Sequence, residues 1–114
     1  MEKIKIPERC ILKNFLAKNP ENSKRVTRPT KYKNKFKLIE HGGEYTRERS
    51  LQLYEVWLDE QLELDPAFLD DLLNLDYLCC FCRKRPSDFE GKWWCHAEII
   101  IDRIKKIKEQ RKIE

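Results

Sequence analysis

The sequence predicts a small α+β domain, an α/β layered arrangement in which helices pack on a three-stranded sheet in the order β-β-α-α-β-α. Three observations lead to this fold class. Two long segments, 47–64 and 96–111, carry apolar residues at helical spacing. The segment 75–81 is a nearly continuous apolar run, as a buried strand should be, and two short segments near the start resemble strands. With 114 residues, the chain fits a single domain over residues 1–114.

The first half of the chain is expected to form two strands, a loop and a helix. Residues 8–13 and 24–28 resemble short strands separated by a turn-rich stretch. The basic loop 24–45 begins with the second of these strands and contains few aliphatic residues. It ends where Thr46 can cap a helix that runs to about Leu64. The buried face of this helix is marked by Leu51, Tyr54, Leu58 and Leu62.

The second half is expected to form a short helix, a strand and a long helix. Asp65 followed by Pro66 predicts a helix start, because proline suits the first helical position. The cysteine-bearing strand and loop then span residues 75–95. The C-terminal helix spans residues 96–111, and its buried side is marked by Ile100, Ile104 and Ile107.

Charge is distributed in three blocks along the chain. Residues 1–49 hold 14 Lys/Arg and 6 Asp/Glu, residues 50–78 hold none and 8, and residues 79–114 hold 10 and 6. No uncharged apolar run approaches the roughly 20 residues that cross a bilayer, and the first residues lack the apolar core of a signal peptide. We therefore expect no membrane association and a cytoplasmic protein, in the host cytoplasm if a phage encodes it.

Seven of the cations fall within residues 24–37, which contain no acid and include two aromatic rings, Tyr32 and Phe36. Cations release counterions from phosphates and rings can stack on exposed bases, so this segment favours a phosphate-bearing partner. The alternative is a solvated loop whose lysines balance the acidic middle block of the same chain.

The five cysteines indicate thiols or metal ligands rather than a disulfide scaffold. Their number is odd, and neighbouring Cys79 and Cys80 could pair only through a strained ring. Three thiols and an imidazole form a candidate zinc set: Cys80, Cys82, Cys95 and His96. The alternative is that these cysteines are small buried hydrophobic residues at a strand–helix junction.

A third hypothesis makes the same junction reactive. Cys95 at the start of a helix, next to His96, would have a lowered thiol pKa and could act as a nucleophile. His96 would then serve as base and Glu98 as proton carrier. Glu98 could equally be an acid that interacts with the helix dipole. Neighbouring Trp93 and Trp94 are either buried or form a platform on which a base stacks.

Five motifs resemble a small, uncharacterised domain family that is common in bacteria and their phages. The motifs are Pro7-Glu8-Arg9, Arg28-Pro29-Thr30-Lys31-Tyr32-Lys33-Asn34-Lys35-Phe36, Thr46-Arg47-Glu48, Cys80-Phe81-Cys82 and Cys95-His96-Ala97-Glu98. The second motif departs from the family pattern Arg-Pro-x-Lys-Trp-Gly-Asn-Pro-Phe, because Tyr32 replaces tryptophan and Lys33 and Lys35 replace glycine and proline. The resemblance implies a domain of unknown function, and the two added lysines favour an anionic ligand.

These observations combine into one expected site, where the basic loop and the cysteine–histidine junction meet at the carboxyl ends of the strands. The candidate ligand-binding residues are Arg28, Lys31, Tyr32, Lys33, Asn34, Lys35, Trp93 and Trp94. We expect a small binding protein of phage or mobile-element type that recognises nucleic acid, a nucleotide or a protein that handles nucleic acid, and that could inhibit a host enzyme. The alternatives are an enzyme acting on nucleotides or nucleobases and a structural subunit of a larger assembly.

Overall fold

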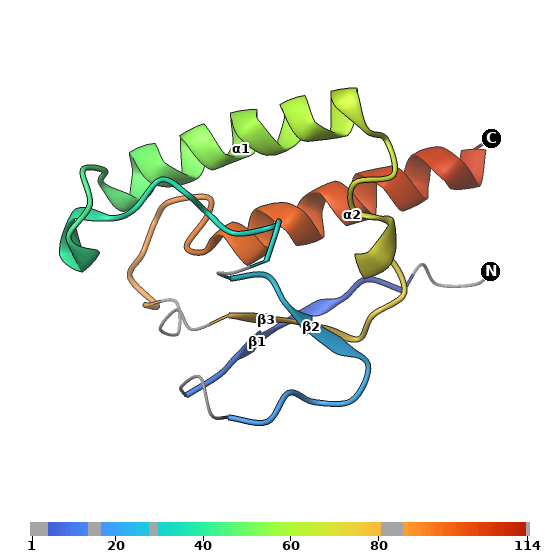
Figure 1. The fold of residues 1–114 in the computed structure, drawn as a ribbon, viewed down its shortest axis with the longest axis horizontal. Coiled ribbons are helices and arrows are strands. Elements are labelled where there is room, and N and C mark those ends of the chain that lie inside the picture. Colours follow the sequence, from blue (N-terminus) through green and yellow to red (C-terminus); the bar gives the residue numbers. More distant parts are fainter. Residues whose placement is uncertain (1–4, 14–16, 28–29, 81–85, 114) are drawn as a thin grey trace.

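The fold is a parallel sheet with both helices on one side, where α2 packs against the sheet and α1 packs against α2 (Figure 1). The computed structural model describes residues 5–13, 17–27, 30–80 and 86–113. The elements are β1 (Glu8–Ile11), β2 (Ser23–Arg25), η1 (Ile39–His41), α1 (Arg47–Leu64), η2 (Asp70–Leu72), β3 (Tyr77–Cys80) and α2 (His96–Ile113), where η denotes a 3-10 helix. The α+β class predicted from the sequence is confirmed. Within the described ranges, neither α-helix is long and apolar enough to cross a membrane.

The three strands run parallel in the order β1-β3-β2, so β3 is central. Cys79 of β3 pairs with Cys10 on one side and with Arg25 on the other. Because all strands point the same way, their carboxyl ends meet at one edge, and both α-helices begin there (Figure 1). The connection through residues 17–22 runs along the opposite face, where the Arg25 guanidinium donates to Ala17 O at 2.8 Å and to Asn19 Oδ1 at 2.9 Å.

Both long helices follow the periodicity of the sequence. Helix α1 begins after Thr46, whose hydroxyl oxygen accepts a hydrogen bond from Arg49 N at 3.2 Å, and it buries Leu51 and Leu58 as predicted. Helix α2 extends two residues beyond the predicted end and buries Ile100 and Ile104. The apolar stripe of each helix therefore forms the core.

The short second helix that the sequence predicts after Pro66 is present as turns and a 3-10 helix rather than as an α-helix. Residues after Pro66 form turns with i to i+3 hydrogen bonds, which end in the 3-10 helix η2. The tighter winding places Leu69 and Leu72 on one side, because residues three apart eclipse in a 3-10 helix, and both are fully buried. The strands also differ from the predicted bounds, since β1 ends at Ile11, β2 ends at Arg25 and β3 begins at Tyr77.

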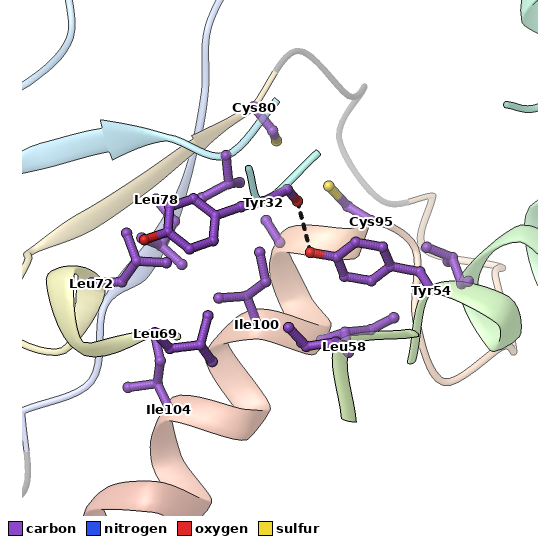
Figure 2. Packing of buried hydrophobic residues seen from close by; sticks show 14 of the residues in the cluster. Tyr32, Tyr54, Leu58, Leu69, Leu72, Leu78, Cys80, Cys95, Ile100 and Ile104 are labelled. Atoms are coloured by element: carbon purple, nitrogen blue, oxygen red, sulfur yellow. Dashed lines mark hydrogen bonds between the residues drawn. The ribbon is translucent and has the colours of Figure 1, made fainter. Parts of the chain in front are cut away.

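The core includes residues from the basic loop as well as from the helices and β3 (Figure 2). Tyr32 is 1% exposed and Tyr54 is 0% exposed. The Tyr54 hydroxyl donates a hydrogen bond of 2.7 Å to the Tyr32 carbonyl oxygen, and burial raises the pKa of that hydroxyl. Inward-facing residues of the loop thus belong to the hydrophobic core.

An arginine joins the two helices at their buried seam. Arg103 of α2 is 9% exposed and donates to Asp59 at 2.7 Å and to Glu55 at 2.8 Å, both on α1. The hydrogen bond to Asp59 is the main reason why the guanidinium pKa is raised. A guanidinium can satisfy several carboxylate oxygens at once because its donors form a rigid fork.

The two buried tyrosines provide a matched test of this core. Tyr54→Phe should lower the free energy of unfolding by about 1–3 kcal/mol, because it leaves the buried Tyr32 carbonyl without its donor. Tyr32→Phe should leave stability unchanged or raise it, because the Tyr32 hydroxyl is buried without an acceptor in the described structure. Urea denaturation measures both, and equal losses in the two variants would contradict this assignment of the hydrogen bond.

Candidate functional site

The starts of both helices, the basic loop and the end of β3 meet at the carboxyl edge of the sheet (Figure 1). His96, the first residue of α2, is buried, and its Nε2 lies 2.7 Å from Val26 O, just after β2. A carbonyl oxygen can only accept, so Nε2 carries the proton in this contact. The histidine therefore connects the start of α2 to the end of β2.

Glu98 acts as the cap of helix α2. Its Oε1 accepts hydrogen bonds from Trp94 N at 2.7 Å and from Cys95 N at 2.8 Å. These amides would otherwise be unsatisfied at the helix start, and a carboxylate there also interacts favourably with the helix dipole. The structure thus agrees with the dipole interpretation of Glu98. Proton transfer by Glu98 Oε1 or His96 Nε2 would first require these contacts to break.

Two cysteines lie beside the core tyrosines at this edge. Cys80 and Cys95 are 0% and 1% exposed, and in Figure 2 both lie on the same side of the hydrogen bond between Tyr54 and Tyr32, with Cys95 the nearer. Both belong to the hydrophobic cluster, as expected of cysteines that act as small apolar residues. A nucleophilic role for Cys95 would require this cluster to open.

Zinc binding stays a prediction. The fourth expected ligand, Cys82, lies outside the described residues, and among those that are described no group of three or more His, Cys, Asp or Glu side chains could hold a metal ion. While His96 Nε2 bonds to Val26 O, a metal would have to use Nδ1 of that ring. Elemental analysis of the purified chain for one zinc per molecule tests the hypothesis.

Three of the expected ligand-binding residues serve the fold. Tyr32 lies in the core, and Trp94 is buried beneath Arg47, whose guanidinium lies 3.8 Å from the indole centroid. Asn34 supports the loop, because its Nδ2 donates to Ser50 Oγ at 2.9 Å and its Oδ1 accepts from Phe36 N at 2.9 Å. Neither buried ring can stack on a ligand in this arrangement. Arg28 lies outside the described residues.

The remaining expected cations face solvent. Exposure alternates along residues 31–38: lysines at 31, 33, 35 and 37 are exposed, while the residues between them are buried or half-buried. No ion pair joins these lysines to any carboxylate of the described residues, although Lys31 lies near two rings. The anchoring of the intervening residues thus places all four ammonium groups on the outside of the loop.

The sequence did not identify two half-buried rings that lie beside these lysines. Lys31 Nζ is 5.1 Å from the Phe68 ring centroid, and Lys35 Nζ is 6.0 Å from that of Trp57. The Trp57 and Phe68 rings meet edge to face at 6.0 Å. We call the following residues the basic–aromatic surface: Lys31, Lys33, Lys35, Phe36, Trp57 and Phe68. Trp57 lies at the border of the predicted apolar stripe of α1, next to Leu58. A large ring at such a border is the sequence signal that could have identified Trp57 as a surface residue.

Trp93 is separated from its neighbour Trp94 and lines two grooves. One groove, of about 530 Å³, lies between α1 and the segment 89–93 and includes Glu48, Glu90 and Phe89. The other, of about 460 Å³, lies between β1 and α2. Trp93 is therefore the accessible member of the tryptophan pair.

The capping role of Glu98 can be tested by stability. Glu98→Ala should lower the free energy of unfolding by about 1 kcal/mol, and Glu98→Gln by less, because glutamine retains an acceptor oxygen. Thermal or urea denaturation measures the difference, with the exposed Glu90→Ala as control. If the chain turns over a nucleotide or nucleobase, and Glu98→Gln abolishes this activity without lowering stability, the result would instead support a catalytic role for Glu98.

Comparison with known proteins gives a family but no activity. A family profile described as "Domain of unknown function (DUF4326)" matches residues 12–106. No curated protein and no solved structure matches the chain. The matched range contains the basic loop, α1, β3 and most of α2. It therefore covers most of the chain, and the resemblance seen in the sequence motifs is confirmed. The chain belongs to the DUF4326 family of domains of unknown function.

Proposed function

We propose that this domain binds single-stranded nucleic acid through the basic–aromatic surface. The observation that carries the proposal is that acids of the middle block form ion pairs with cations other than the loop lysines. The alternative to a phosphate-bearing partner was that the loop lysines balance these acids, which lie in residues 50–78. In the structure, acids of that block pair with other cations: Glu55 and Asp59 with Arg103, Asp70 with Arg111, and Asp76 with Lys5.

The loop lysines are consequently available to an external polyanion. They project from a loop that is held in place by buried residues, so binding requires little ordering of the backbone. Each phosphate that a lysine neutralises releases a condensed counterion, which gives affinity at low salt. The charge of the loop thus favours a ligand with several phosphates in a row.

The half-buried rings favour a single strand over a duplex. Phe36, Trp57 and Phe68 lie among the lysines and are half-buried residues. Unpaired bases can reach and stack on such rings, whereas paired bases in a duplex cannot. Exposed acids Glu60 and Asp71 stand on α1 and η2 next to this surface and would repel a strand that crossed them. The strand should therefore follow the loop.

Removal of the lysine charges tests the proposal. The triple variant Lys31→Ala, Lys33→Ala and Lys35→Ala should bind a fluorescent oligonucleotide at least about tenfold more weakly at low salt. The slope of log affinity against log salt should fall by about 2, as expected for three lost contacts to a single strand. Fluorescence anisotropy measures both quantities.

A matched triple variant controls for net charge. Lys13, Lys18 and Lys106 are exposed and lie outside the basic–aromatic surface, so their replacement by alanine should change affinity little. An equal loss of affinity in the two triple variants would contradict a localised site, and unchanged affinity in the first would overturn the proposal.

A duplex of the same length tests the role of the rings. It should bind more weakly than the single strand, and Phe36→Leu should reduce the affinity for the single strand while leaving that for the duplex unchanged. Equal affinity for the two forms would overturn stacking on these rings.

A further inference from the structure

Cys10 and Cys79 face each other across two neighbouring strands of the sheet. They are the two of the five cysteines that the predicted zinc set leaves out, and both thiols are free. Cys10 lies on β1 and is half-buried, whereas Cys79 lies on the central strand β3 and is 0% exposed. The register of the sheet makes these residues direct partners. Two thiols that the candidate site does not use are therefore adjacent in space, although they are far apart in the sequence.

Both side chains belong to the face of the sheet that is turned away from the helices. Leu78 and Cys80 are members of the hydrophobic core cluster. Because successive side chains of a strand point to opposite faces, Cys79 between them points away from this core, and its partner Cys10 lies on the same face as Cys79. The connection through residues 17–22 runs along this face (Figure 1). Cys79 is thus a fully buried thiol that lies outside the core cluster.

The geometry of the pair suits a disulfide. Neighbouring strands of a sheet lie about 4.8 Å apart, and the α-carbons of a disulfide lie about 4.4–6.8 Å apart. Burial raises the pKa of the Cys79 thiol, and interaction with the Cys10 thiol adds to this rise, so the two thiols are close to each other. A disulfide between them therefore requires rotation of two side chains rather than rearrangement of the sheet.

The two thiols differ in access, which assigns them different roles. Cys10 lies on an edge strand and keeps part of its surface accessible, so a small oxidant can approach it from solvent. Cys79 has no accessible surface, and its sulfur can react only with a neighbouring group. Thiols that sense oxidants are accessible and often lie next to a second thiol that resolves the oxidised form. Cys10 has the position of the first thiol and Cys79 that of the second.

We propose that Cys10 and Cys79 are a site of reversible oxidation, at which a small hydroperoxide closes a disulfide between β1 and β3. With hydrogen peroxide, the Cys10 sulfur attacks one oxygen, the O–O bond breaks, and a sulfenic acid forms while hydroxide leaves. The Cys79 sulfur then attacks the Cys10 sulfur, the S–O bond breaks and the S–S bond forms, while a second hydroxide leaves. The two thiol protons neutralise the hydroxides, so two thiols and one peroxide give one disulfide and two waters.

This site is independent of nucleic-acid binding by the basic–aromatic surface. The two share no residue, and Cys10 and Cys79 lie on the face of the sheet away from the helices. Failure of one proposal therefore leaves the other standing.

Peptide mapping of the full chain tests the link. The reduced chain is treated with a small excess of hydrogen peroxide, its remaining thiols are alkylated in urea, and it is digested with trypsin without a reductant. Two of the five thiols should be lost, and mass spectrometry should find peptide 10–13 joined to peptide 50–83. Treatment with dithiothreitol should restore all five thiols.

Cysteine variants identify the partner, because peptide 50–83 also contains Cys80 and Cys82. Cys79→Ala should abolish the link, whereas Cys80→Ala should retain it, since the Cys80 side chain belongs to the core on the opposite face. Fragmentation of the linked peptide between residues 79 and 80 makes the same assignment in the unmodified chain. Cys10→Ala removes a half-buried thiol from an edge strand and should also abolish the link, which keeps the test decisive if Cys79→Ala is unstable.

The link should also raise thermal stability. It closes a loop of about 70 residues, which restricts the unfolded chain more than the folded one. The oxidised chain should therefore unfold at a temperature several degrees above that of the reduced chain, as measured by circular dichroism. Cys10→Ala after the same peroxide treatment is the control and should show no such rise.

Three results would overturn the proposal. Peroxide could leave all five thiols intact, which would show that Cys10 is not accessible to the oxidant. Sulfenic or sulfinic acid could accumulate at Cys10 without a link, which would show that the two sulfur atoms do not meet in the folded sheet. Finally, Cys10 could be joined equally to Cys79 and Cys80, in which case the register of the sheet would not direct the pairing.

Discussion

The arrangement of this domain depends on how the backbone carbonyls of an irregular segment are satisfied. Residues 26–27 and 30–36 follow β2 without forming a helix or a sheet, so their polar backbone groups need other partners once they are buried. Three of their carbonyls accept hydrogen bonds from helical side chains: Val26 from His96, Tyr32 from Tyr54, and Phe36 from Ser50. Each donor lies on α1 or α2, so the loop holds both helix starts at the carboxyl edge of the sheet. These hydrogen bonds therefore connect the loop to both helices at the edge of the sheet.

The anchoring of the loop backbone also determines which loop side chains are exposed. Because Tyr32, Asn34 and Phe36 are held inward by packing and hydrogen bonds, the lysines between them must point outward. In a flexible loop the ammonium groups of these lysines would occupy many positions. In this structure the anchored residues between them hold the lysine backbone in one conformation. Fixed charges are more effective for binding than mobile ones, because less conformational entropy is lost when a ligand orders them.

The sequence predicted regular elements better than side-chain directions. Helix α1 was predicted at its observed bounds because periodicity over 18 residues is a local signal. The segment after Pro66 carries the same signals over a few residues, too short a stretch to distinguish a 3-10 helix from an α-helix. Tyr32 and Trp94 were expected to stack on a ligand, since aromatic rings near lysines have the composition of a binding site. Their burial depends on Tyr54 and Arg47, which are distant in sequence, and neighbouring Trp93 has a different environment for the same reason.

The three charge blocks of the sequence acquire a physical meaning in the structure. Acids of the middle block lie on α1 and η2, where Arg103 and Arg111 of the third block reach them across the helix seam. Parallel placement of α1 and α2 on one side of the sheet brings these blocks together, while the basic loop of the first block leads into the start of α1 (Figure 1). Had the loop lysines met Glu55 and Asp59 instead, the buried Arg103 would lose two of its three carboxylate partners and keep only Asp102, which is a costly arrangement. The burial of Arg103 thus favours pairing of Glu55 and Asp59 with the third block, and the lysines of the loop are left without a carboxylate partner among the described residues.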